Sequence, residues 1–257
     1  LYTTYYYKWK AENRQFLFSN INYFESGESV INGIFPKISS KQELNIISKL
    51  QKIKKTIGYY SLRIKNGNIL YYRNSGGRYW KIITNFRPTF YLNNKKGISS
   101  RESYLYFSDT TLRDIIISNL NSSLYFWYYV MHSDARTNNP SDLKNFPLDQ
   151  DVFRKNLKKN LIELCKILMN DLQKNSIIQT ANYRTGDVKY QQFLPAKSKA
   201  IIDEIDKVLA KHYGFTEEEL DFIINYDIKY RMREEFFNNE NEKENEQLIK
   251  NNNSFLK

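Results

Sequence analysis

The chain has 257 residues, of which 41% are hydrophobic, and a formal net charge of +11. This length allows one large domain or two small ones with a sizeable buried core. No run of about 18 apolar residues occurs, which argues against a helical membrane span, and one cysteine with two histidines argues against a disulfide framework and a structural zinc site. The chain opens on Leu1 and its first ten residues lack the apolar centre of a signal peptide, so we expect a cytoplasmic chain that is processed or part of a longer protein.

The positive charge is unevenly distributed along the chain. Residues 1–145 hold 21 Lys and Arg against 9 Asp and Glu, whereas residues 146–257 hold 18 against 19. A lysine-rich proteome would also produce a basic chain, but it predicts an even spread of lysine. The uneven spread favours a polyanionic partner for the first part, and nucleic acid is the partner we expect.

The first part predicts a small, curved, mostly antiparallel sheet joined by basic loops. Short segments rich in Tyr, Phe and Ile alternate there with turn residues. Asn66-Gly67 is typical of a type I′ hairpin turn, and Gly76-Gly77 supplies the next bend. The four predicted strands are residues 58–64, 68–73, 78–84 and 88–92.

Two helices are predicted beside this sheet. Residues 41–55 carry apolar side chains at helical spacing with lysines on the opposite face. Residues 110–131 begin as an amphipathic helix with Asp109 as the expected N-cap, and then become apolar on all sides, which predicts burial. Residues 138–148 hold two prolines and are predicted to form a loop.

The second part of the chain predicts mainly helices. Leucines at intervals of three and four between 157 and 172 indicate a long amphipathic helix. The polar stretch 182–193 is predicted to interrupt the helices. Residues 237–257 are polar and of low complexity, which predicts a frayed or disordered tail.

Helix ends in this second part carry recognisable capping residues. Ser198 is the expected start of one helix, and Gly214 occupies the position that a C-cap favours. Thr216 and Glu219 form a capping-box pattern that predicts the start of the next helix.

No motif of catalysis or nucleotide binding is found in the sequence. The stretch "NSGGRYWK" at 74–81 combines glycines with cations, as phosphate-binding loops do. It lacks the G-x-x-x-x-G-K-[ST] and G-x-G-x-x-G spacings, and β-prone residues follow it. We therefore interpret it as a hairpin bend. The G-x-S-x-G nucleophile elbow is also absent.

Three groups of polar residues are weak candidates for chemistry. His132 and Asp134 have the residue types of an acid–base pair, but a histidine that closes a buried helix more often has a structural role. His212 lies beside a helix C-terminus, where the dipole favours a cation. Asp149 and Asp151 fit a metal-dependent nuclease, yet no lysine or second acid follows at a convincing spacing. We predict no catalytic residue, no metal site and no cofactor site in this chain.

Nucleic-acid contacts have better support, because cations lie among aromatic residues between positions 73 and 101. Lys and Arg bind phosphates or read guanine, and aromatic rings stack on bases. Small hydroxyls beside Gly97 allow a backbone amide to approach a phosphate. Asn121, Ser122 and Ser123 are less favoured because they fall in a predicted helix. The predicted DNA-binding residues are Arg73, Ser75, Arg78, Tyr79, Lys81, Lys95, Lys96, Ser100 and Arg101.

Several segments resemble a known family. The runs "YYRNSGGRYWKIITNFRPTFY", "SSRE" and "NLNSSLYFWYYVMHSDARTNNPSDLKNFPL" resemble the TaqI-like C-terminal specificity domain, the target-recognition domain of N6-adenine DNA methyltransferases and type IIG restriction–modification enzymes. The opening 2–23 and the closing 190–232 look like segments of the same large enzymes. The resemblance covers roughly residues 2–233 and implies sequence-specific binding of double-stranded DNA.

The chain also departs from that family. The Asn/Asp-Pro-Pro-Tyr/Phe motif and the glycine-rich S-adenosylmethionine motif of the methyltransferase domain are absent, and Asn139-Pro140-Ser141-Asp142 is only a superficial echo of the first. The nuclease domain of type IIG enzymes is absent too. The resemblance therefore implies a recognition module that is not itself an enzyme, with S-adenosylmethionine bound by a separate methyltransferase domain or subunit.

Together these observations predict an α+β chain in three parts. They are a DNA target-recognition domain at 1–147, a helical spacer and docking segment at 148–235, and a polar tail at 236–257. Two alternatives remain open, namely a stand-alone nucleic-acid-binding protein from a truncated gene and a protein-interaction subunit of a restriction–modification assembly. We expect no membrane partner.

Overall fold

The structure is a computed structural model of the chain. It describes residues 1–6, 11–16, 18–27, 33, 35–63, 67–75, 82–184 and 186–228. Arg78, Tyr79 and Lys81, the first part of the predicted strand 78–84 and the predicted tail lie outside these residues.

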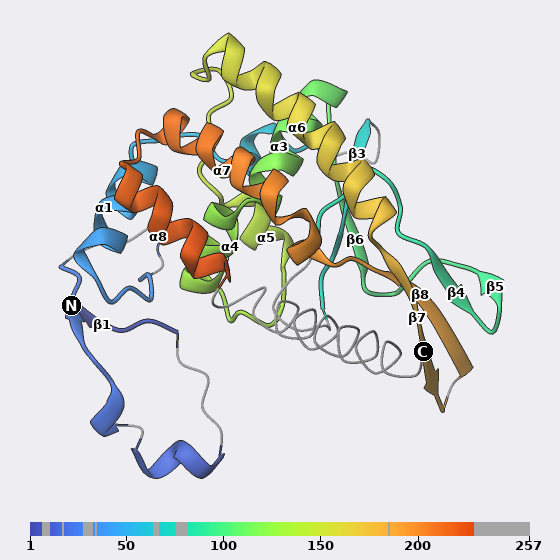
Figure 1. Ribbon diagram of the computed structural model, residues 1–257, viewed down its shortest axis with the longest axis horizontal. Helices are drawn as coiled ribbons and strands as arrows, with labels where there is room; N and C mark the ends of the chain where they lie inside the picture. Colours follow the sequence, from blue (N-terminus) through green and yellow to red (C-terminus); the bar gives the residue numbers. More distant parts are fainter. Residues whose placement is uncertain are drawn as a thin grey trace, which may run out of the picture.

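The α+β class is confirmed, with helices and small antiparallel sheets mixed along the chain (Figure 1). The α-helices of the described part are α1 (Lys41–Leu50), α2 (Ile57–Tyr60), α3 (Thr110–Asn121), α4 (Ser123–His132), α5 (Pro140–Lys144), α6 (Lys155–Lys174), α7 (Lys199–Tyr213) and α8 (Glu217–Asp227). Short 3-10 turns cover Ala11–Phe16, Phe18–Asn20 and Pro195–Ser198.

The described strands form three separate antiparallel sheets rather than one curved sheet. β1 (Tyr2–Thr3) pairs with β2 (Phe24–Glu25), and β3 (Asn68–Arg73) pairs with β6 (Glu102–Phe107). The third sheet has the order β5-β4-β8-β7. Its strands are β4 (Phe90–Leu92), β5 (Lys95–Lys96), β7 (Ile177–Tyr183) and β8 (Gly186–Gln192).

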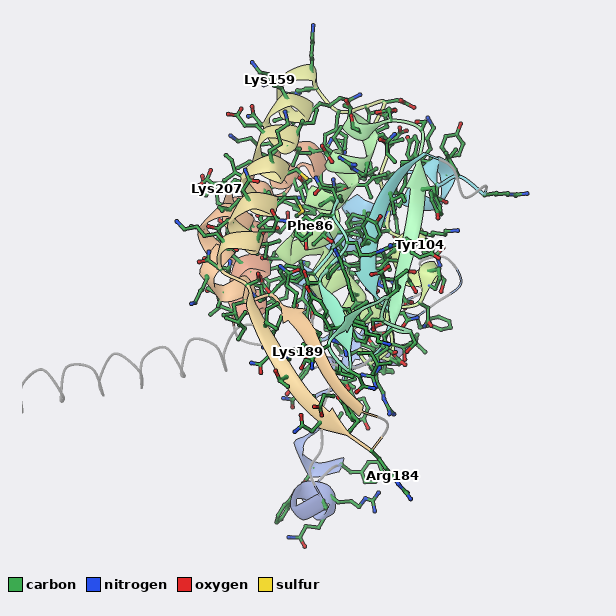
Figure 2. The ribbon with its side chains drawn as sticks, turned by 90° about the vertical axis from the view of Figure 1, so that its right-hand side faces the viewer. Phe86, Tyr104, Lys159, Arg184, Lys189 and Lys207 are labelled. Carbon is green, nitrogen blue, oxygen red and sulfur yellow. The ribbon has the colours of Figure 1, made fainter. Side chains whose placement is uncertain are left out.

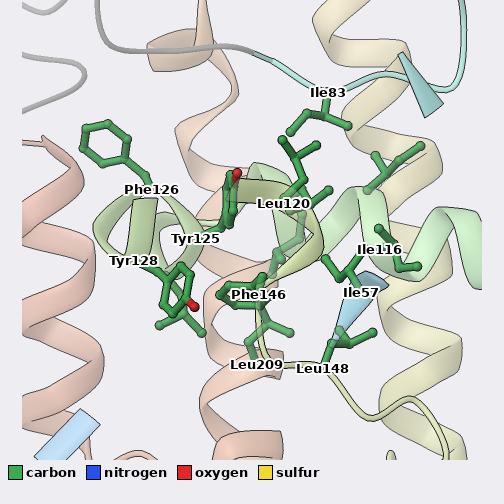
Figure 3. Close-up of a cluster of buried hydrophobic side chains, with 14 of the residues drawn as sticks. Ile57, Ile83, Ile116, Leu120, Tyr125, Phe126, Tyr128, Phe146, Leu148 and Leu209 are labelled. Carbon is green, nitrogen blue, oxygen red and sulfur yellow. The ribbon is translucent and has the colours of Figure 1, made fainter. Parts of the chain in front are cut away.

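The core is centred on α4, whose residues 123–131 are all buried. Helices α3, α7 and α8 pack against it. Figure 3 shows Tyr125 and Tyr128 of α4 turned toward Phe146, and both rings meet Phe146 edge to face, with centroids 5.5 and 5.1 Å apart. A segment that is apolar on every side is stable only when other elements surround it, and this one is surrounded.

The core extends across residue 147, the predicted end of the first domain. Leu161 and Leu168 of α6 and Ile205 of α7 belong to the same buried cluster as Ile116 of α3. The four-stranded sheet also joins β4 and β5, from before residue 147, to β7 and β8, which follow it. The described residues before and after position 147 therefore share one core, and both contribute strands to the four-stranded sheet.

The predicted helix 110–131 is divided into α3 and α4 at Ser122. Asp109 caps α3 as expected, because its Oδ1 accepts a hydrogen bond from the Leu112 amide at 2.8 Å. Ser122 has an extended backbone, and its hydroxyl accepts from the Tyr125 amide at 3.0 Å. A serine that can cap a new helix thus ends one helix and starts the next.

The prediction of a strand at 58–64 is wrong for the residues described there, because Ile57–Tyr60 form α2. Ile57 is fully buried, and α2 packs against α5. Among the described residues, strand β3 pairs with β6 and not with residues 58–63. Asn66 of the predicted hairpin turn lies outside the described residues. Gly67 has a φ of +121°, and a Cβ there would lie 2.5 Å from the Phe107 carbonyl oxygen.

One further prediction needs correction. The loop expected at 138–148 contains α5, which begins at Pro140, a position where a missing amide hydrogen costs nothing. Its start is held by a hydrogen bond of 2.6 Å from the Asn139 amide to Asp142 Oδ2. The polar stretch 182–193 interrupts the helices as predicted, because α6 ends at Lys174 and α7 begins at Lys199, and it includes parts of strands β7 and β8.

The predictions for the long helix and the helix ends are confirmed. Helix α6 covers the leucine-spaced region, and Gly214 ends α7 with a left-handed φ of 71°. The Thr216–Glu219 capping box starts α8, with bonds of 2.8 and 3.2 Å between the two residues.

Candidate nucleic-acid interface

Six of the nine predicted DNA-binding residues are described by the structure, and they lie on or next to β3, β5 and β6. Strand β3 ends at Arg73, and Ser75 follows it. Strand β5 carries the exposed Lys95 and Lys96, and the segment from β5 to β6 carries the exposed Ser100 and Arg101. The three remaining residues, Arg78, Tyr79 and Lys81, lie outside the described part.

Arg73 and Arg101 are brought together by the pairing of β3 with β6. Arg73 pairs with Glu102 in the β-ladder, and the amide of Asn74 donates to the Arg101 carbonyl at 2.9 Å. Burial lowers the pKa of Arg73, and the positive charge of Arg101 lowers it further. The two guanidinium groups are therefore close enough to repel each other.

Glu102, the nearest carboxylate in sequence, does not neutralise this pair. Its Oε1 accepts from Arg87 Nε at 2.9 Å, while Arg73 Nε donates to the Ser75 carbonyl at 3.0 Å. Among the described residues, neither Arg73 nor Arg101 forms an ion pair with a carboxylate. The ends of β3 and β6 therefore carry two positive charges that no described carboxylate pairs with, which favours an anion there.

The hairpin β7–β8 adds residues that the sequence analysis missed. Arg73 Cζ lies 5.6 Å from the centre of the Tyr190 ring, and Tyr183 also influences the pKa of Arg73. Figure 2 shows Arg184 at the far end of this hairpin and Lys189 along it. The run "YRTGDVKY" held a signal for it, since Gly186 with flanking polar residues is a turn pattern.

The far end of the hairpin is attached to the β4–β5 turn through Asn93. The Asn93 amide donates to the Asp187 carbonyl at 2.8 Å, and the Asp187 amide donates to Asn93 Oδ1 at 2.9 Å. Asn93 and Asn94 both have positive φ, 49° and 61°, which asparagine tolerates better than most residues. The two turns are thereby held side by side.

The less favoured candidates Asn121, Ser122 and Ser123 are buried and serve the core. The Asn121 side chain forms two hydrogen bonds with the backbone of Ile83. It accepts from the Ile83 amide at 3.1 Å and donates to the Ile83 carbonyl at 2.8 Å. Ser123 donates to Asp227 at 2.8 Å. None of the three faces solvent.

The weak candidates for chemistry have structural surroundings. His132 stacks on Tyr128, His212 stacks on Phe153, and burial lowers both pKa values to about 4. The neutral His212 therefore does not act as the cation that the helix dipole favours.

Asp149 and Asp151 share a lysine that sequence spacing did not reveal, because Lys55 lies almost a hundred residues earlier. Lys55 Nζ is 3.5 Å from Asp149 Oδ1 and 2.5 Å from Asp151 Oδ2. Tyr60 donates to Asp149 at 3.0 Å. Within the described part of the chain, no group of three or more His, Cys, Asp or Glu is placed to hold a metal ion.

The comparisons with known proteins found no matching protein family, no matching curated protein and no matching solved structure. Among the described helices, none has the length and apolar character needed to cross a membrane.

Proposed function

We propose that this chain is the target-recognition module of an N6-adenine DNA methyltransferase or type IIG restriction–modification enzyme, and that it binds double-stranded DNA sequence-specifically. The observation that carries the proposal is the pair Arg73 and Arg101, which lie together without a carboxylate partner among the described residues. A phosphate group between them relieves their mutual repulsion and accepts charge-assisted hydrogen bonds from both.

The surroundings of this pair support a polyanion rather than a small anion. Lys95 and Lys96 are exposed on the same stretch of chain, only a few residues before Arg101. A row of cations matches the repeated charges of a DNA backbone, which dominate affinity, while base edges in the grooves supply specificity.

The resemblance noted in the sequence extends the proposal to a partner. It implies that a methyltransferase domain or subunit holds S-adenosylmethionine and flips the target adenine, and that this chain fixes the register on the duplex. Helices α6 and α7 are the proposed docking surface, and the cytoplasm is the proposed location.

A selection from random duplexes with this chain tests the proposal. We expect one enriched sequence, bound with a steep fall in affinity as salt rises, because each neutralised phosphate contributes about 0.9 to the slope of log K against log salt. Arg101→Ala weakens binding, whereas Lys159→Ala, which removes the same charge from the exposed face of α6 (Figure 2), leaves it nearly unchanged.

Two other outcomes identify the alternatives. Affinity for random duplexes within a few-fold of the selected site favours a stand-alone, sequence-tolerant binder. Affinity that does not change with salt contradicts phosphate contacts altogether and favours a protein-interaction subunit.

A further inference from the structure

We propose that the β7–β8 hairpin is a second DNA-binding element, an arm whose far end enters a groove of the duplex beside the phosphates held by Arg73 and Arg101. The described residues of the arm are 177–184 and 186–192. This inference rests on the proposed function, and it assigns DNA contacts to the part of the chain expected to be a spacer.

The arm projects from the helical part of the protein. Figures 1 and 2 both show the hairpin extending away from the packed helices, and Figure 2 shows Arg184 at its far end. β8 pairs with β4 through Val188–Tyr190, so the exposed end of the arm, where β7 and β8 meet, is the part that a groove of the duplex can admit. The strands, each seven residues long, span roughly 20 Å.

The side chains at the end of the arm suit this partner. Asn182, Tyr183 and Arg184 are all exposed, and Tyr183 keeps 56% of its surface accessible. Arg reads guanine and Asn reads adenine in the major groove. The arm carries two basic residues, Arg184 and Lys189, and one acidic residue, Asp187.

The arm is held in place before any partner binds. Its turn is attached to Asn93 by two backbone-anchored hydrogen bonds of 2.8 and 2.9 Å. Gly186 has a φ of +126° and lies against the Asn93 side chain, which fills the space where a Cβ would stand. A preorganised element loses little conformational freedom on binding, so more of its contact energy appears as affinity.

The arm and the arginine pair form one surface. The Tyr190 ring of β8 lies beneath the Arg73 guanidinium, and Lys95 and Lys96 lie on β5, in the same four-stranded sheet as the arm. A ligand bound by Arg73 and Arg101 would therefore lie next to the arm.

A protein strand is the competing partner. β7 is an edge strand with no charged residue, and Ile178 is 54% exposed on it. Uncharged edge strands can pair with a strand of another chain. The cations at the end of the arm and on β5 favour DNA, and strand pairing becomes an outcome of the test.

Two measurements on the duplex found by selection test the arm. Arg184→Ala is expected to weaken binding about tenfold, as loss of a base or phosphate contact does. The matched control Lys159→Ala is expected to leave binding unchanged. Arg184 is exposed, so the variant should fold as the wild type does, which thermal unfolding verifies.

Site-directed cleavage gives a readout independent of affinity. Cys165 is buried and burial raises its thiol pKa to about 12, so a thiol-specific iron–EDTA reagent should label only an introduced cysteine. Asn182→Cys with this reagent is expected to cut the duplex within the bound site, and Lys159→Cys is expected not to cut it.

The outcomes separate the two proposals. If wild type binds the duplex and Arg101→Ala weakens it, but Arg184→Ala does not and Asn182→Cys does not cut, the arm proposal alone is wrong. The arm proposal is also wrong if the chain forms concentration-dependent dimers that bury Ile178 and Arg184→Ala binds DNA as the wild type does. That result favours pairing of β7 with a strand of another chain. If wild type binds no duplex, both proposals fail, and preferential binding of RNA overturns the choice of duplex DNA.

Discussion

The guanidinium of Arg73 lies over the ring of Tyr190, with 5.6 Å between Cζ and the ring centre. This contact joins the end of β3 to β8, two elements more than a hundred residues apart in the sequence. Arg73 repels Arg101, so it needs an attractive neighbour to hold its direction. The electron-rich face of tyrosine provides one.

Replacing Tyr190 by leucine is expected to weaken DNA binding several-fold, because the cation–π contact that orients Arg73 is lost. Such contacts contribute about 0.5–2 kcal/mol. Tyr190→Phe keeps the ring and should bind as the wild type does. The measurement is the dissociation constant of each variant on the selected duplex. Equal affinity of the leucine and phenylalanine variants would contradict this role.

Local features of the fold were predictable from the sequence, and long-range pairing was not. Gly214 and the Thr216–Glu219 capping box were identified correctly because helix ends depend on residues within one turn. The partner of β3 was missed because β6 lies about thirty residues later, and no local pattern indicates that Leu70 pairs with Leu105. The Tyr-rich segment 58–64 favoured a strand, but packing against α5 makes its start helical.

The candidate interface was predictable only in part, for a related reason. Lys95, Lys96 and Arg101 are candidates from the sequence because cations concentrate in the first part of the chain. Arg184 and Lys189, which the structure adds as candidates, do not stand out in the sequence, because the average charge of the second part is near zero and conceals a local group of cations. Only the fold brings β8 beside β4 and gives these residues their place.

Gly186→Ala is expected to destabilise the arm and the whole fold. The φ of +126° is strained for any residue with a Cβ, and the new atom would lie 2.3 Å from Asn93 Oδ1. We expect a loss of about 1–3 kcal/mol in the free energy of unfolding measured with urea, together with weaker DNA binding. Gly97→Ala is the control, since its Cβ would meet only Phe90 at ordinary contact distance. A Gly186→Ala variant as stable as Gly97→Ala would show that the turn adopts another conformation.

Asp206 is expected to make stability fall as pH rises toward neutrality. Burial raises its pKa from 3.8 to about 7, with a further contribution from Asp227 and an opposing one from Lys199. A raised pKa means that the folded chain holds a proton that the unfolded chain releases. The stabilisation is therefore complete below pH 3.8 and is lost as pH rises through about 7.

Asp206→Asn tests this dependence. The Ser123 and Leu124 amides donate to different oxygens of Asp206, at 3.2 and 3.3 Å. The amide of the variant does not ionise and can accept from only one of them, so its stability is lower at every pH and only the slope against pH is compared. Between pH 4 and 7 the wild type should lose up to about 1.4 kcal/mol per pH unit relative to the variant. Parallel stability profiles of the two proteins, measured by urea unfolding at each pH, would refute the expectation.

His212 is expected to act in the opposite direction over an overlapping range. Burial against Phe153 lowers its pKa from 6.5 to about 4, although Asp149 raises it slightly. The neutral ring is favoured in the folded chain, so the stabilisation is complete above pH 6.5 and is lost as pH falls through about 4. His212→Gln removes the titrating group, and its unfolding free energy should decline less than that of the wild type between pH 6.5 and 4. Urea unfolding at half-unit intervals of pH measures the difference, and an equal decline in both proteins would mean that His212 is protonated as readily in the folded chain as in the unfolded one.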